Sequence, residues 1–156
     1  MDRRSVLKTV SILVGGALSA GTVATIMSGC GSSETANGDW SPQTLSQEEV
    51  KLLAEVVETI LPKTDTPGAK ELLVHQAIDS GLTDNFTKEE QTKFKNGLAE
   101  IDAAAQTAHK KSFVDASSEE RLAILSDFDK TRGENAFGMI KNMTIGCYFI
   151  TEVGQT

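Results

Sequence analysis

The chain of 156 residues has little of what most catalytic centres require. It contains two cysteines and two histidines, and their spacing suits neither a tetrahedral metal site nor an iron–sulfur cluster. It also lacks a glycine-rich phosphate loop, a dinucleotide-binding fingerprint and a Cys-x-x-Cys-His haem motif. These absences argue against a self-sufficient oxidoreductase, and we expect no cofactor or metal in this chain.

The charge balance is acidic. There are 15 Lys and Arg residues against 22 Asp and Glu residues, and residues 30–156 alone carry a formal charge of −9. A surface of this sign repels the phosphates of nucleic acids, so we expect no nucleic-acid partner. With 39% apolar residues the chain can bury a core, and its length limits it to one domain.

Residues 1–29 have the three parts of a signal peptide. Arg3 and Arg4 precede an uncharged stretch from Thr9 to Gly29, which glycines interrupt and small residues close. The arginine pair resembles the twin-arginine export motif, whose signals are less apolar than those of the general secretory route. We therefore expect export of a folded protein.

Cys30 follows Met27-Ser28-Gly29, a sequence that resembles a bacterial lipoprotein box. We expect lipidation of Cys30, with residues 30–44 as a small, polar and flexible tether. The expected location is a bacterial membrane, inner or outer, facing the periplasm. An uncleaved membrane anchor and a cleaved soluble protein are the alternatives.

The remaining residues, 45–156, have clear helix signals. Three capping boxes pair Ser46 with Glu49, Thr87 with Glu90, and Ser117 with Glu120. Apolar residues at helical spacing follow each box, and the longest helix is expected over residues 88–109. Pro62 should end the first helix, and Pro67 should begin a second that stops at Gly81.

The last helix, expected over residues 134–151, is apolar on nearly every side. It should lie at the centre of the molecule or be covered by a partner. Helical periodicity also places Ala77, Ala108 and Leu122 on apolar stripes. Because no run of β-branched residues alternates as a strand would, the predicted fold class is all-α, a compact bundle of about five helices.

The isolated polar residues have structural explanations. The capping hydroxyls have no nearby histidine to accept a proton, so we interpret them as caps rather than nucleophiles. His109 lies near the C-terminal end of a helix, where the helix dipole favours it. Cys147 lies among apolar residues and is expected to be a buried free thiol, with pairing to another subunit or to a missing segment as the alternatives.

Two segments resemble the gluconate 2-dehydrogenase subunit 3 family. They are Leu-Pro-Lys-Thr-Asp-Thr-Pro-Gly-Ala at residues 61–69 and Ile-Gly-Cys-Tyr-Phe-Ile-Thr-Glu-Val-Gly at residues 145–154. The resemblance covers roughly residues 45–156. Cys147 stands where the family usually has Gly, and the chain ends at Thr156, where members commonly continue. A C-terminally truncated subunit is therefore one expectation.

The resemblance implies a non-catalytic small subunit that accompanies a flavin-dependent sugar or polyol dehydrogenase. The large subunit would hold FAD and substrate, and the small one would assist its export, assembly and anchoring. Candidate contacts with the large subunit are Thr64, Asp65, Thr66, Pro67, Gly68, Phe137, Ile140, Met143, Tyr148 and Phe149. Core packing is the alternative for the aromatic residues, and a plain turn is the alternative for the loop. The rival function is a stand-alone lipid-anchored binding or structural module.

Overall fold

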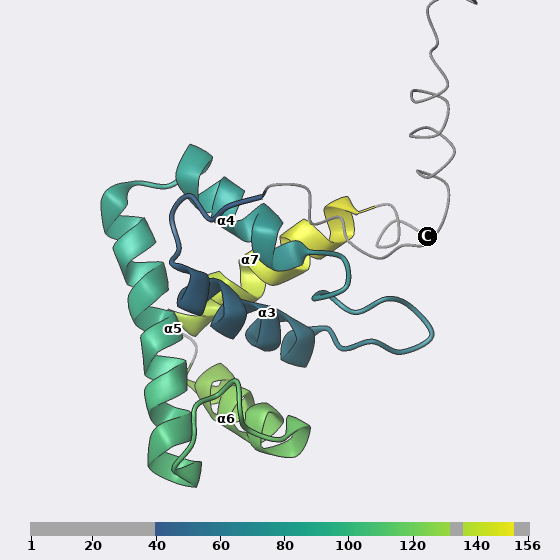
Figure 1. Ribbon diagram of the computed structural model, residues 1–156, viewed down its shortest axis with the longest axis vertical. Coiled ribbons are helices and arrows are strands. Elements are labelled where there is room, and N and C mark those ends of the chain that lie inside the picture. The colour runs from purple at the N-terminus through teal and green to yellow at the C-terminus, as the bar shows by residue number, and fades with distance from the viewer. Residues whose placement is uncertain (1–39, 132–135, 152–156) are drawn as a thin grey trace, which may run out of the picture. The chain divides into compact units, whose positions relative to one another are not determined.

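The computed structural model describes residues 40–131 and 136–151, which form five helices and no strand (Figure 1). The helices are α3 (Gln47–Ile60), α4 (Val74–Asn85), α5 (Lys88–His109), α6 (Ser118–Lys130) and α7 (Phe137–Ile150). The predicted all-α fold class is thus confirmed. Arg3, Arg4 and Cys30 lie outside the described residues, so the signal peptide and lipidation stay predictions.

Three helices begin at the predicted capping boxes. In each box the cap hydroxyl accepts a hydrogen bond from the backbone amide three residues on, and the glutamate there accepts one from the cap's own amide. The boxes start α3, α5 and α6, and α5 spans the predicted residues 88–109. These predictions are therefore confirmed. The sequence could make them because a capping box depends on residues that are close in sequence.

The predicted start of α4 is wrong. The helix begins at Val74 rather than Pro67, and the loop before it ends at Leu73, whose φ of 55° lies in the left-handed region. In this loop the backbone amide of Lys70 donates to the carboxylate of Glu58 instead of to a helical carbonyl. A contact with α3 therefore overrides the local helix signal of the proline.

The predicted end of α4 is also wrong, because Gly81 does not stop it. The helix continues to Asn85, and Leu82 on its inner face is fully buried. The side-chain amide of Gln91 donates to the backbone oxygens of Leu82 and Phe86, at 2.8 and 3.1 Å. These bonds supply partners for carbonyl groups that a helix end leaves open.

The last helix is central, as its apolar sequence predicts. α7 packs against α3, α4, α5 and α6, and its residues Ile140 and Thr144 are fully buried. The Thr144 hydroxyl donates to the Ile140 oxygen at 2.8 Å, so its burial leaves no donor unsatisfied. Gly97 in α5 allows a close approach, because a Cβ there would lie 2.6 Å from the Cβ of Ala136.

Three alanine and leucine positions assigned to apolar stripes lie at the surface. Ala77, Ala108 and Leu122 are exposed, Leu122 by 57%. α4 instead buries Ile78, and α6 turns Leu125 inward. In Figure 1, α5 runs along one side of the bundle, α3 and α7 extend from it at an angle, and α6 lies beside its C-terminal half.

A buried carboxylate on α4 holds the segment that precedes α3. Asp79 is fully buried, and its two oxygens accept hydrogen bonds from the backbone amides of Gln43, Thr44 and Leu45, at 2.7, 3.1 and 2.7 Å. Three backbone donors satisfy the charge, as a buried carboxylate requires. The end of the predicted tether is thereby fixed to the bundle.

Replacing this carboxylate should destabilise the fold. In Asp79→Asn one acceptor oxygen becomes an amide donor that faces a backbone N–H, so the free energy of unfolding should fall by about 2 to 3 kcal/mol. Urea denaturation of the full chain measures it. Asp84→Asn, on the exposed side of the same helix, is the matched control, and equal unfolding free energies for the two variants would refute the anchoring role.

Candidate functional site

The loop between α3 and α4 carries five of the predicted contact residues, and residues 62–66 form its exposed tip. At the tip the amide of Thr64 donates to the Thr66 oxygen at 3.0 Å, which makes a tight turn. Nearer the bundle the amide of Ala69 donates to the Leu61 oxygen, also at 3.0 Å. The two ends of the loop are thus tied together.

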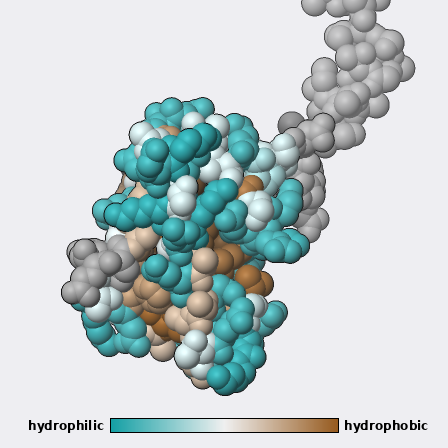
Figure 2. All heavy atoms as spheres, turned by 90° about the vertical axis from the view of Figure 1, so that its left-hand side faces the viewer, coloured by the Kyte–Doolittle hydropathy of each residue, from teal (hydrophilic) through white to brown (hydrophobic). Residues whose placement is uncertain are grey.

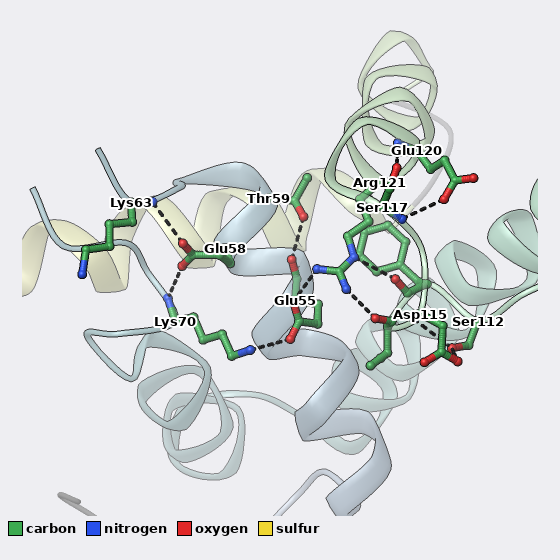
Figure 3. A network of polar contacts seen from close by, with 12 residues as sticks. Glu55, Glu58, Thr59, Lys63, Lys70, Ser112, Asp115, Ser117, Glu120 and Arg121 are labelled. Atoms are coloured by element: carbon green, nitrogen blue, oxygen red, sulfur yellow. Dashed lines mark hydrogen bonds and ion pairs between the residues drawn. The ribbon is translucent and has the colours of Figure 1, made fainter. Parts of the chain in front are cut away.

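One carboxylate of α3 fills the inside of this loop (Figure 3). Glu58 accepts the backbone amide of Lys63 on one oxygen at 3.0 Å and that of Lys70 on the other at 2.9 Å. Gly68 makes room for it, because a Cβ at that position would overlap the Glu58 carboxylate. The glycine of the family-like segment is therefore required by a close approach rather than by its own backbone angles.

Tyr148 of α7 connects the two segments that carry the family resemblance. Its hydroxyl donates to the Pro67 oxygen at 3.0 Å, across 81 positions of sequence. The neighbouring Phe149 meets the Tyr148 ring edge-on, with centroids 5.9 Å apart. Phe149 and Ile150 are 56% and 77% exposed. The exposed end of α7 is therefore joined by one hydrogen bond to Pro67, the residue that follows the 62–66 tip.

The other predicted contacts on α7 lie deeper. Phe137 and Ile140 are 3% and 0% exposed, which makes them core residues. A partner could not reach them in this conformation, so they leave the set of candidate contacts and the packing alternative holds for them. Met143 is half-buried. Helical periodicity could not separate these residues from Tyr148 and Phe149, because α7 is apolar all round.

A second carboxylate of α3 joins the loop to α6. Glu55 pairs with the ammonium of Lys70 at 2.5 Å and with the guanidinium of Arg121 (Figure 3). Partial burial by itself would raise the pKa of Glu55, but the hydrogen bond from Lys70 and the charge of Arg121 outweigh it and hold that pKa below its usual value. Glu55 therefore stays ionised between its two cations.

Arg121 also fixes the connection between α5 and α6. Its Nε donates to the Phe113 oxygen at 2.9 Å, a terminal nitrogen donates to the Val114 oxygen, and the guanidinium lies 5.8 Å from the centroid of the Phe113 ring. The buried Phe113 side chain anchors this connection to the core. α3 thus positions two loops through neighbouring glutamates.

A groove with a volume of about 670 Å³ lies between α3, α5 and residues 112–114. Apolar side chains such as Leu52, Leu98 and Val114 line it together with charged ones. Figure 2 looks onto the side where α5 lies and shows apolar surface among hydrophilic side chains in its lower half. The lining includes no histidine, and its Ser112 hydroxyl donates to Asp115 at 2.7 Å, so the groove holds no nucleophile with an imidazole base.

The histidines and the thiol occupy separate environments. His75 is buried, and burial together with the charge of Lys70 lowers its pKa. His109 lies 3.4 Å from Glu120. Cys147 is a half-buried free thiol whose pKa burial raises, so it stays protonated near neutral pH. Within residues 40–131 and 136–151 no three potential metal ligands come together, and no helix is both long and apolar enough to cross a bilayer.

The family model described as gluconate 2-dehydrogenase subunit 3 matches residues 47–156. The chain belongs to this family. No significant match was found among curated proteins or among solved structures.

Membership of the gluconate 2-dehydrogenase subunit 3 family implies association with a dehydrogenase catalytic subunit. The match includes both the 62–66 tip and α7. We call the surface made by that tip with Tyr148, Phe149 and Ile150 the contact face. In this family member, two of the segments that the sequence named as candidate contacts therefore meet in space.

Glu55 and Glu58, which organise this face, were missed by sequence reasoning. Both lie within the first helix, where their hydrogen bonds reach residues outside it. A weak signal existed, because Glu55 interrupts an apolar run from Leu52 to Val57. A charge among buried positions indicates a specific partner, although it does not say which one.

Proposed function

We propose that this chain is the accessory small subunit of a membrane-associated, FAD-dependent gluconate or sugar dehydrogenase. The catalytic subunit supplies FAD, the substrate site and the reaction. This chain supplies a folded partner for export, assembly and attachment to the membrane. The observation that carries the proposal is the family match over residues 47–156, which covers nearly the whole helical region.

The N-terminal sequence supports the export and anchoring parts of the role. Arg3 and Arg4 suit a route that carries folded proteins, so a docked catalytic subunit would cross the membrane together with this chain. Lipidation of Cys30 would then hold the complex at the periplasmic side of the membrane. Because the Asp79 carboxylate binds the backbone amides of residues 43–45, the C-terminal end of the tether is attached directly to α4.

The contact face has the composition of a protein interface. Phe149 and Ile150 offer exposed apolar area, and the 62–66 tip, which is followed by the Pro67 oxygen that Tyr148 binds, offers exposed hydroxyls and a carboxylate. Interfaces typically combine an apolar centre with a polar rim, and large aromatic side chains provide much of their binding energy. We therefore propose this face as the surface on which the catalytic subunit docks.

Co-purification tests the assignment. The native protein, extracted from the membrane with mild detergent, should carry a flavin-containing dehydrogenase subunit that mass spectrometry identifies. The double change Phe149→Ser and Ile150→Ser should reduce the recovered dehydrogenase at least about fivefold, because an exposed apolar anchor is lost. Leu122→Ser, an exposed leucine on α6, is the control and should recover the wild-type amount. Recovery of the wild-type protein with no oxidoreductase would favour the stand-alone module and overturn the proposal.

Anchoring has its own test. Cys30→Ser should move both the small subunit and the dehydrogenase bound to it from the membrane fraction to the soluble fraction, since the acyl chains would be absent. Cys147→Ser, the matched control, should leave both in the membrane fraction. Immunoblotting of the two fractions measures the distribution. A Cys30→Ser protein that stays in the membrane would contradict lipid anchoring.

A further inference from the structure

The shape of the 62–66 tip is set from inside the bundle. Both oxygens of Glu58 are occupied by backbone amides on either side of the tip, Lys63 before it and Lys70 after it. The Tyr148 hydroxyl holds a third point at the Pro67 oxygen. The backbone around the tip is thus held at three points, although its side chains face solvent.

Among the charged side chains in and beside the tip, the Asp65 carboxylate is available to bind a partner. The ammonium of Lys63 pairs with Glu71 at 2.8 Å, and that of Lys70 pairs with Glu55. Asp65 lies between these two lysines in sequence, is exposed, and makes no hydrogen bond or ion pair within the part of the chain that the structure describes. The tip therefore displays a carboxylate whose nearest cations in the loop are engaged elsewhere.

We propose that Glu58 is a positioning residue that holds the 62–66 tip so that Asp65 meets a basic side chain of the catalytic subunit. The proposal rests on the proposed function and names the chemistry of that contact. Glu58 itself does not touch the partner. Because the loop is ordered before binding, association need not supply the ordering of its backbone, which strengthens binding without an added contact.

The choice of a cation as the complement follows from charge. Residues 30–156 carry a formal charge of −9, so a complementary partner surface is basic. A carboxylate next to hydroxyls, as in Thr64-Asp65-Thr66, matches the donors of an arginine or lysine. Such a pair steers association and fixes orientation.

The test measures the affinity of full-length variants for the dehydrogenase that co-purifies with the wild-type protein. Glu58→Gln keeps the size of the side chain but presents an amide donor to one loop N–H, so affinity should fall about tenfold as binding takes on the ordering of the loop. Asp65→Asn should weaken binding roughly fivefold. Added salt should reduce the difference in affinity between this variant and the wild type, because it screens the ion pair. Glu100→Gln, at an exposed position of α5, is the control and should bind as the wild type does.

The double variant Glu58→Gln with Asp65→Asn tells whether Glu58 acts by positioning Asp65 or only by stabilising the fold. If Glu58 acts by presenting Asp65, the losses are not additive, and the double variant should bind about as weakly as Glu58→Gln alone. Circular dichroism should show that each variant keeps its helices. Fully additive losses, or wild-type affinity in either single variant, would overturn the inference while leaving the proposed function intact. If no dehydrogenase co-purifies with the wild type, the proposed function itself fails, and this inference fails with it.

Discussion

The arrangement of both long loops depends on two carboxylates that lie one turn apart on α3. Glu58 accepts two backbone amides of the loop before α4, and Glu55 joins that loop to Arg121 of α6. α3 itself packs against the other four helices, so the glutamates project from an element that all the others hold in place. Carboxylates in such a place are stabilised only when their hydrogen-bond partners are fixed as well, and here the partners are the loops.

The same arrangement leaves a preformed surface at the end of α7 and the loop between α3 and α4. α7 buries Phe137, Ile140 and Thr144, whereas its C-terminal end exposes Phe149 and Ile150 and binds the loop through Tyr148. A surface assembled from a rigid helix end and a pinned loop suits recognition better than a flexible loop would, because little conformational entropy is lost on binding. In the proposed complex this chain therefore contributes a preformed docking surface and the attachment to the membrane, while its partner catalyses the reaction.

The sequence predicted the features that depend on near neighbours. The capping boxes at Ser46, Thr87 and Ser117 formed as expected because their hydrogen bonds span three residues. The start of α4 was mispredicted because Glu58 captures the amide of Lys70 twelve positions later, and hydrogen bonds to backbone amides leave no pattern in side-chain sequence. On α7 the sequence predicted the contact helix but not which of its residues are exposed. An all-apolar helix does not show whether Ile140 or Phe149 faces solvent, because that depends on how the four neighbouring helices pack against it.

Amide hydrogen exchange tests the preformed loop most directly. In the isolated subunit the amides of Lys63 and Lys70 should exchange slowly despite their exposed side chains, because the Glu58 carboxylate holds both. When the dehydrogenase is bound, the amides of residues 65 and 66 should gain protection while those two change little. Fast exchange of Lys63 and Lys70 in the free protein, with protection appearing only in the complex, would mean that the partner forms the loop and would contradict the account.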